Sequence, residues 1–313
     1  MNYKYKVKIE DSKQLAIALE SKNVDEVIIA RDSFSDLALP EIVSKVKSSK
    51  KKVWIMLERI SRYEEFKNQE LRVSTDKIFD MPNLDGIIIQ NLDSFSYMLR
   101  RANRFKNERI KIELNYTMNC YNLEAKKLFI ELYNEKRDNH DELPLLFTSP
   151  LELNTYELND VGYDTLLVYS YIDTMVTANC LRKNINDSRG ELREPNDRRG
   201  ELREPACKLK FNFDKVQNFS SYIIDRKGKK LHYKTYCKYC YNKIFNTEPL
   251  YLIDKIDDLL SKIIVDNENS RGVSCKPTLR IDFSFENENE VRDILNGKIP
   301  NSFTRGHIKN TIK

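Results

Sequence analysis

Cysteines are the residues of this 313-residue chain with the clearest capacity for chemistry, and there are six of them. Cys237 and Cys240 form a C-x2-C pair in "CKYC", a spacing that lets two thiolates turn toward one metal ion or cluster. A thioredoxin-like redox pair usually has an apolar or proline filling, which "KY" does not match. The pair therefore favours metal binding.

A second pair of cysteines, Cys180 and Cys207, is separated by a tandem repeat. Residues 186–195 read "NDSRGELREP" and residues 196–205 read "NDRRGELREP". Without the repeat the segment reads "CLRKNIAC", a C-x6-C pair. The repeat is polar, has balanced charge and carries Gly and Pro in each copy, so we interpret it as a solvated insertion at a loop tip, where extra length costs little closure entropy. The two pairs together make a candidate set of four thiolates.

The alternative for each cysteine is a structural role as a small buried hydrophobe. That alternative applies most to Cys120 and Cys275, which lie beside strand or helix patterns without thiol partners. The chain shows no export signal, since "MNYKYKVKIEDSKQ" has no apolar core followed by a small-residue cleavage site. We therefore expect a cytoplasmic protein with reduced thiols, whose clustered cysteines serve metal or redox chemistry rather than disulfides.

The composition is that of a soluble globular protein, with 40% hydrophobic and 32% charged residues. No apolar run reaches the length of a membrane span, so no membrane association is expected. The net charge of +5 is too small and too dispersed to indicate nucleic-acid binding by itself.

Short β-rich runs alternate with helical patterns along most of the chain. Strands are predicted at 3–9, 25–30, 52–57, 85–90, 109–114, 143–148, 164–171 and 277–285. Helices are predicted at 11–22, 39–49, 91–103, 122–136 and 286–297, the first with Asp11 as its N-cap. Apolar strands separated by helices indicate βαβ units and a parallel sheet.

Eight strand–helix units are the number that closes a (β/α)8 TIM-barrel-like fold. An open doubly wound sheet is the alternative, but its first βα turn would bind phosphate, and "KIEDSKQ" has no glycine there. We predict βα units one to seven in residues 1–175, an insertion between the seventh and eighth strands in 176–250, and the final βα unit and tail in 251–313. The insertion carries the cysteines and a hairpin at 221–234, and should rise from the C-terminal face of the barrel, where active sites form.

Polar side chains on the eighth strand are the best candidates for a substrate site. In "RIDFSFE", Arg280, Asp282 and Ser284 share one face of the strand, and Glu286 lies just beyond its end. Arg280 at the barrel mouth could hold an anionic group, or it could form a structural pair with Asp282. Glu152 follows the sixth strand in "SPLELN" and is expected to reach the same mouth.

The residues themselves show little protease machinery. There is no H-E-x-x-H helix and no G-x-S-x-G elbow, and the three histidines are scattered along the chain. A nucleophilic Cys–His pair assembled from distant residues stays open. A set of four cysteines is more typical of a metal site than of an enzyme that uses one cysteine as its nucleophile.

Five segments resemble successive landmarks of the peptidase U32 family, the collagenase-like proteases. They are "DTMVTANCLRKN", "YIIDRKGKKLHY", "CKYCYNKIFNTEPLYLID", "LRIDFSFENENE" and "FTRGHIKN". The resemblance covers most of the chain and is closest to the carboxy-terminal part of the long members, where a similar "TRGH" lies near the end, which makes His307 a further candidate catalytic residue. It implies a barrel-like fold and a cluster bound by Cys180, Cys207, Cys237 and Cys240. The N-terminus lacks the glycine-rich opening of the family, and "VYSYIDTMV" replaces the commoner "VYGRLPLMV", which suggests a partial or divergent member.

Some relatives of this kind hold a 4Fe–4S cluster and support hydroxylation of RNA bases or of a quinone ring, whereas others carry a protease label. The resemblance therefore implies an iron–sulfur modification enzyme acting on RNA or another large acceptor, with zinc as the alternative metal. A partner chain would supply a missing amino-terminal half. The alternatives are a collagenase-like peptidase with a protein or peptide substrate, and a catalytically silent barrel that serves as a scaffold. The low glycine count, 8 residues, favours the scaffold slightly, since active βα loops often use glycine.

Overall fold

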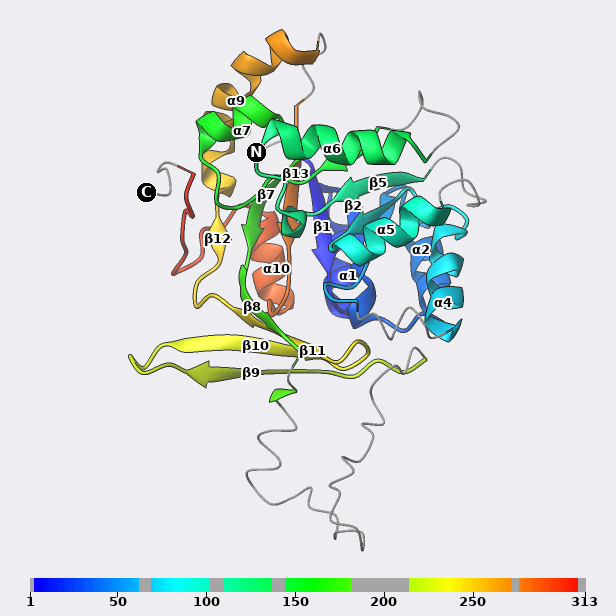
Figure 1. The fold of residues 1–313 in the computed structure, drawn as a ribbon. Helices are drawn as coiled ribbons and strands as arrows, with labels where there is room; N and C mark the ends of the chain where they lie inside the picture. Colours follow the sequence, from blue (N-terminus) through cyan, green and yellow to red (C-terminus); the bar gives the residue numbers. More distant parts are fainter. Residues whose placement is uncertain are drawn as a thin grey trace, which may run out of the picture.

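The computed structural model describes residues 3–61, 69–101, 110–136, 144–178, 180–181, 214–271 and 276–308. Within these ranges the chain forms a large, mostly parallel sheet with helices around it and a separate antiparallel sheet at one end (Figure 1). No helix in this part of the chain combines the length and the apolar composition that crossing a membrane requires.

Eight parallel strands make up nearly all of the large sheet, in the order β7-β13-β1-β2-β3-β4-β5-β6. They are β1 (Tyr5–Ile9), β2 (Val24–Ala30), β3 (Lys52–Met56), β4 (Gly86–Ile89), β5 (Lys111–Leu114), β6 (Leu146–Phe147), β7 (Thr165–Ser170) and β13 (Thr278–Asp282). The short strand β12 (Leu250–Tyr251) adds to β7 in the antiparallel sense. The sequence-predicted strands at these eight places are confirmed.

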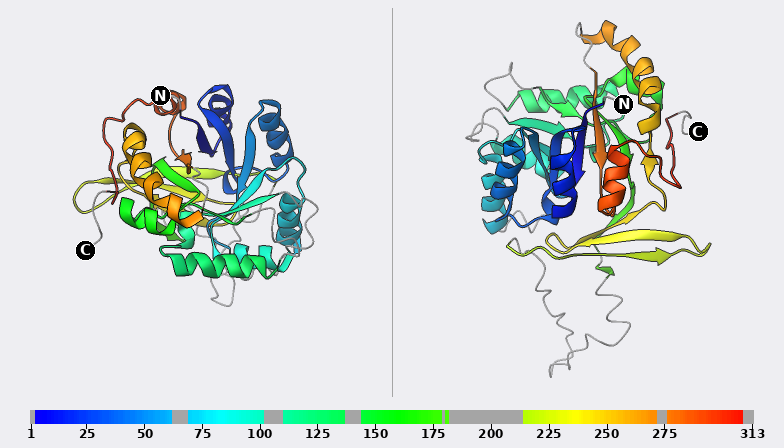
Figure 2. Two further views of the ribbon diagram at one scale, coloured as in Figure 1. Left: turned by 90° about the horizontal axis from the view of Figure 1, so that it is seen from above. Right: turned by 180° about the vertical axis from the view of Figure 1, so that it is seen from behind.

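The sheet curls until its two ends approach each other. Thr148, just after β6, forms a parallel bridge with Thr165 of β7. The Asp164 amide donates to the Phe147 carbonyl at 3.0 Å, and the Ser149 amide donates to the Thr165 carbonyl at 2.9 Å. The result is a barrel-like α/β fold, seen from above in Figure 2, in which β6 and β7 meet through a single bridge rather than a ladder. We call this curled sheet the barrel.

Helices follow most strands and cover the outside of the barrel (Figure 1). They are α1 (Ser12–Glu20), α2 (Leu39–Ser48), α4 (Gln69–Phe79), α5 (Leu92–Arg101), α6 (Leu123–Asn134), α7 (Thr155–Val161), α9 (Ile256–Arg271) and α10 (Glu288–Leu295), with the short 3-10 turns η1 (Arg31–Ser33), η3 (Tyr116–Met118) and η4 (Ile253–Lys255). The predicted helices α1, α2, α5, α6 and α10 are confirmed, and the Asp11 side chain caps α1. The sequence pattern does not predict α4, α7 and α9.

The two faces of the strands have different surroundings. Apolar residues such as Val7 and Ile9 pack under the helices in the main core. A small apolar cluster of Ile28, Trp54, Met56 and Ile88 lies on the other face, inside the barrel. A Cβ atom added to Gly86 would overlap the six-membered ring of Trp54. Only glycine therefore leaves room for this tryptophan in the lumen.

The chain between β7 and β12 includes a four-stranded antiparallel sheet, which we call the cap. Its strands are β8 (Asp173–Thr177), β9 (Asn218–Ile224), β10 (Lys230–Tyr236) and β11 (Tyr241–Phe245), in the order β8-β11-β10-β9. The cap lies across the carboxyl ends of the barrel strands (Figure 1), the end that we call the mouth. The Asn246 amide donates to the Ile172 carbonyl at 2.9 Å, so the chain enters and leaves the cap side by side.

The predicted hairpin at 221–234 is present as β9 and β10. The Asp225 carboxylate accepts from the amides of Lys227 and Lys229 at 2.8 Å each. Gly228 adopts a φ of +78°, which this turn requires and which glycine adopts without steric cost. The turn therefore fixes the register of the two strands.

Candidate functional site at the barrel mouth

Charged side chains fill the lumen beneath the cap. Because side chains alternate along a strand, Lys6 and Lys8 of β1 point into the lumen while their apolar neighbours face the helices. The Lys6 ammonium donates to Glu113 and lies 3.2 Å from the centre of the Trp54 ring. Burial lowers the pKa of Lys6, although Glu113 opposes the shift. The lumen is thus filled by ion pairs as well as by apolar groups.

Arg280 and Asp282, both predicted site residues, form one of these pairs. Arg280 is 0% exposed and donates through Nε and Nη2 to the two Asp282 carboxylate oxygens, at 2.7 Å each. Its Nη1 donates to Asn115 Oδ1 at 2.9 Å and to Thr148 Oγ1 at 3.3 Å. These internal acceptors engage the guanidinium on all sides. This geometry matches the structural Arg–Asp pair and leaves no donor of Arg280 open to an anionic ligand.

Glu10 joins the barrel to the cap at the mouth. It accepts from Lys8 Nζ at 2.7 Å, from Lys234 Nζ of the cap at 2.6 Å and from the Tyr236 hydroxyl at 2.9 Å. Burial by itself would raise the pKa of the Glu10 carboxyl, but the Lys234 and Lys8 ammonium groups outweigh burial and hold that pKa well below its usual range. Glu10 is therefore ionised at neutral pH.

Asp32, on the neighbouring strand end, behaves in the opposite way. Its carboxylate accepts from the Tyr241 hydroxyl of the cap, and its carbonyl accepts from Asn218 Nδ2 at 3.2 Å. Burial raises the pKa of Asp32, and the nearby Glu10 charge adds to the shift. The Ser33 hydroxyl lies 3.4 Å from an oxygen of each carboxyl group. Two carboxyl groups whose pKa values are pushed apart are suited to act as an acid and a base in one reaction.

The C-x2-C pair lies in the hairpin turn between β10 and β11. Tyr236 and Tyr241 close the turn with rings stacked 5.1 Å apart, and the Cys240 amide donates to the Cys237 carbonyl at 3.2 Å. Cys240 has a φ of +54°, a left-handed conformation that non-glycine residues seldom adopt. Both side chains are thiols rather than disulfides. The turn thus brings the two cysteines together in a tight loop.

Lys238, at the tip of this turn, fastens it to the barrel mouth. Its buried ammonium donates to the carbonyls of Arg31 at 2.9 Å and Phe34 at 3.0 Å, and to Asp36 Oδ1 at 2.5 Å. Burial lowers the pKa of Lys238 to about 8, against the opposing charge of Asp36. The cysteine turn is therefore held at the carboxyl end of β2, at the mouth, where the sequence predicts the insertion to lie.

The remaining cysteines are only partly described. Cys180 is half-buried, whereas Cys120 is buried in the main core, as its structural alternative requires. Cys207, Cys275 and the repeat at 186–205 lie outside the described residues. Among the residues that the structure describes, no three His, Cys, Asp or Glu side chains are arranged to hold a metal ion together.

Glu286 lies at the end of β13, beside the mouth. Its Oε2 accepts from the amides of Ser284 at 2.6 Å and Phe285 at 2.9 Å, which folds the carboxylate back onto the strand end. Burial raises the pKa of this carboxyl group, although the amide donors oppose the shift. Lys234 of the cap donates to the Ser284 carbonyl at 3.2 Å, so Glu286 adjoins the contact between cap and barrel.

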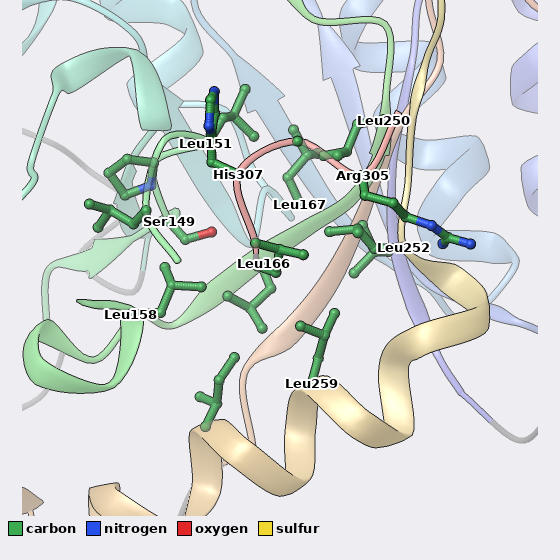
Figure 3. Close-up of a pocket in the computed structure, with 16 residues that line it drawn as sticks. Ser149, Leu151, Leu158, Leu166, Leu167, Leu250, Leu252, Leu259, Arg305 and His307 are labelled. Carbon is green, nitrogen blue, oxygen red and sulfur yellow. The ribbon is translucent and has the colours of Figure 1, made fainter. Parts of the chain in front are cut away.

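His307 lies beside a cavity that Arg280 does not line. This narrow cavity of about 30 Å³ is lined by Leu151, Leu153 and His307, and by leucines of β7 and α9 (Figure 3). His307 is exposed at its edge. Glu152, in the loop that follows β6, contacts Tyr121, and burial together with the Glu152 carboxylate raises the pKa of Tyr121. Arg305 of the "TRGH" segment pairs with Asp254 and stacks on Phe303 at 4.4 Å. The "TRGH" segment therefore packs against β12 and η4 and does not contact Arg280 at the mouth.

Several residues of the mouth were not singled out from the sequence, namely Lys6, Lys8, Glu10, Asp32 and Glu113. A signal for them exists in "YKVKIE", where charged residues alternate with apolar ones in a strand that is buried on both faces. Such a strand must place its charged face in a polar interior. No comparable signal exists for the cap contacts, since they join residues about 200 positions apart.

The comparisons with known proteins reach only distant structures. No family model matches the chain, and no curated protein matches it. The solved structure of the U32 peptidase Mk0906 is similar with a TM-score of 0.41 at 12% identity, covering 66% of this chain and 85% of that chain. An uncharacterized B. cereus protein is similar with a TM-score of 0.34 at 14% identity, covering 56% of this chain and 50% of that chain. Both likenesses concern the course of the backbone and say nothing about activity.

Proposed function

We propose that this protein is a U32-peptidase-like protein on an eight-unit barrel, with a metal centre bound through Cys180, Cys207, Cys237 and Cys240. The centre serves a hydroxylation-type modification of an RNA base or another large acceptor in the cytoplasm, with a partner chain completing the enzyme. The observation that carries the proposal is the position of the C-x2-C turn, which Lys238 fastens to the barrel mouth.

The donor set fits a centre that prefers thiolates. Cys237 and Cys240 share one turn, and the pairing of β8 with β11 directs the chain toward them, since Thr177 lies opposite Asn242 and Cys180 follows three residues later. Thiolates bind iron–sulfur clusters and zinc, the two centres expected from the sequence. When bound, a 4Fe–4S cluster would supply one-electron chemistry, and zinc would supply a structural or Lewis-acid centre.

The carboxyl groups at the mouth provide the proton transfers of this proposal. Asp32, whose pKa burial raises, is the proposed proton donor, and Glu10, held ionised by Lys234 and Lys8, is the proposed proton acceptor. Tyr236 and Tyr241 of the cap orient these two carboxyl groups through their hydroxyls. Residues of the cap and the barrel therefore complete the site together.

The closed mouth favours a second candidate, a catalytically silent scaffold. The lumen charges Arg280 and Lys6 are fully paired with internal carboxylates, and the cap covers the strand ends. A scaffold would use the same thiolate centre only to fasten a cap that has a small core of its own.

Metal analysis of the full chain, purified without oxygen, tests the proposal. Wild type and Cys120→Ser should hold equal iron or zinc, and an iron–sulfur cluster would add visible absorption. Cys237→Ser should lose metal and unfold at a lower temperature, because binding energy at the folded site is also folding energy. Equal metal content in Cys237→Ser and wild type would refute the ligand assignment. If the protein retains its metal and neither Asp32→Asn nor Glu10→Gln changes turnover, the scaffold function is supported instead.

A further inference from the structure

The hairpin of β9 and β10 extends beyond the barrel wall. In both side views it projects past β7 and β12 on the side of the C-terminus (Figures 1 and 2). We call residues 220–230 the arm. Nearly every residue of the arm is exposed, including Tyr222 at 50% and Ile224 at 58%. An apolar and aromatic surface of this kind, outside any core, marks a contact surface.

The arm is also strongly basic. Its turn exposes Arg226, Lys227, Lys229 and Lys230 around a single carboxylate, Asp225. The amides of Lys227 and Lys229 both donate to Asp225 Oδ1, so this carboxylate shapes the hairpin turn, and it is the single carboxylate beside four cations. Lys230 Nζ lies 4.8 Å from the centre of the Tyr222 ring, which holds a positive charge beside an exposed aromatic face. The arm thus offers an anionic partner both charge and a stacking surface.

The face of the arm that carries Tyr222 continues to the barrel mouth. Tyr222 pairs with His232 across the hairpin, and both lie on the face that turns toward the barrel. His232 contacts Phe285 at 5.2 Å and Tyr171 at 6.2 Å, measured between ring centres. Tyr171, His232 and Phe285, which we call the aromatic cluster, are each partly exposed. Aromatic faces therefore lead from the arm to the ends of β7 and β13.

Polar groups for recognition adjoin the aromatic cluster. Ser284 Oγ, next to Phe285 in the sequence, is buried and has no hydrogen-bond partner among the described residues. The buried Glu286 carboxyl, on the other side of Phe285, interacts with the Tyr169 hydroxyl. A buried polar atom without a partner is costly unless a ligand or water satisfies it. The Ser284 hydroxyl therefore supplies a hydrogen-bonding group at the place where the aromatic row ends.

We propose that the arm and the aromatic cluster bind single-stranded RNA and lead it to the barrel mouth. Basic side chains that track phosphates, together with aromatic faces on which bases stack, are the chemistry that recognises an unpaired strand. A duplex would hide its bases from Tyr222. The proposal rests on the proposed function for RNA as the acceptor, and it names an unpaired segment as the part that is bound.

Fluorescence anisotropy with the full chain and a labelled oligouridylate about ten nucleotides long tests this proposal. Tyr222→Ala should weaken binding about tenfold, because one stacked base is lost. Tyr156→Ala is the matched control, since Tyr156 is an 80% exposed tyrosine on α7, outside the arm, and it should leave binding unchanged. Lys227→Ala should lower the slope of log affinity against log salt concentration by about 0.7, the value for one lost single-strand phosphate contact.

Three results would overturn the proposal. Equal affinities of Tyr222→Ala and Tyr156→Ala would remove the stacking role. Equal affinity for an RNA duplex of the same length, or preferential binding to phosphatidylserine vesicles, would assign the arm to a different partner. Metal content measured on the same samples separates this proposal from the proposed function. RNA binding by a protein without metal would contradict the metal centre but not the RNA-binding role of the arm.

Discussion

The lumen of the barrel and the arm of the cap both contain several lysines, and they use them in opposite ways. In the lumen, Lys6 and Lys8 are buried and paired with Glu113 and Glu10. In the arm, four cations share one carboxylate that is already engaged by backbone amides. Charges that neutralise one another inside a fold set its shape, whereas exposed charges without a counter-charge are available to a partner. The buried lysines of the lumen therefore support the structure of the site, whereas the exposed cations of the arm are available to bind a partner.

The largest expected effect follows from breaking a lumen pair. Arg280→Met removes both donors to the Asp282 carboxylate and leaves a buried charge, which should lower the free energy of unfolding by about 3–5 kcal/mol. Urea denaturation followed by circular dichroism measures the loss. The double variant Arg280→Met/Asp282→Leu should recover most of it, since no charge is then left alone. A loss below about 1 kcal/mol in the single variant would mean that the lumen charges do not set the shape of the barrel.

An intermediate effect, dependent on pH, should distinguish Glu10 from Asp32. The pKa of Glu10 is lowered in the folded protein, so its stabilisation is present above its unfolded pKa, about 4.3, and is lost as the pH falls through the folded value. Glu10→Gln should therefore cost about 3 kcal/mol at pH 7 and progressively less in acid. The pKa of Asp32 is raised, so its contribution declines as the pH rises above about 3.9.

For that reason Asp32→Asn should increase stability at pH 7. Thermal unfolding of both variants and wild type between about pH 2 and pH 8 checks the two signs and the loss of the Glu10 contribution in acid. If both substitutions shift stability in the same direction at pH 7, the two carboxyl groups are not an acid and a base with opposed pKa shifts.

The smallest effect is expected from deletion of the repeat at 186–205. Its polar composition and the restored C-x6-C spacing predict a change in unfolding free energy below about 1 kcal/mol, with metal content unchanged. Chemical denaturation and metal analysis of the deletion variant give both values. Loss of soluble protein or of metal would show that the repeat supports the fold or the centre.

Much of the barrel was predictable because each strand carries a local signal. Runs such as "DEVIIA" and "DGIIIQ" are short, apolar and β-branched, and they form β2 and β4. The missed helices had weaker signals: α4 and α9 have long polar stretches, and α7 is only seven residues long. Local periodicity therefore predicted the order of the strands but not every helix between them.

The site was less predictable, because its residues meet through the fold rather than through spacing. Period-two alternation placed Arg280 and Asp282 on one face, where they pair. Nothing local indicates that Tyr241 reaches Asp32 or that Lys238 reaches Asp36. Glu152 follows the barrel strand β6, as expected, and adjoins Tyr121, which follows β5 and η3. The predicted four-cysteine centre stays a prediction, with Cys207 outside the described residues.

The narrow neck between cap and barrel has a consequence for how such a protein can change over generations. β7 ends at Ser170 and β8 begins at Asp173, while β11 ends at Phe245 and the chain rejoins the barrel at Leu250. Entry and exit are bonded to each other through Asn246 and Ile172. The cap is a separate sheet, so a gene segment encoding the whole cap can be exchanged without breaking a hydrogen bond between the barrel strands. Recombination at these two connections would place different caps over the mouth of the same barrel. Each cap would bring its own specificity for a partner.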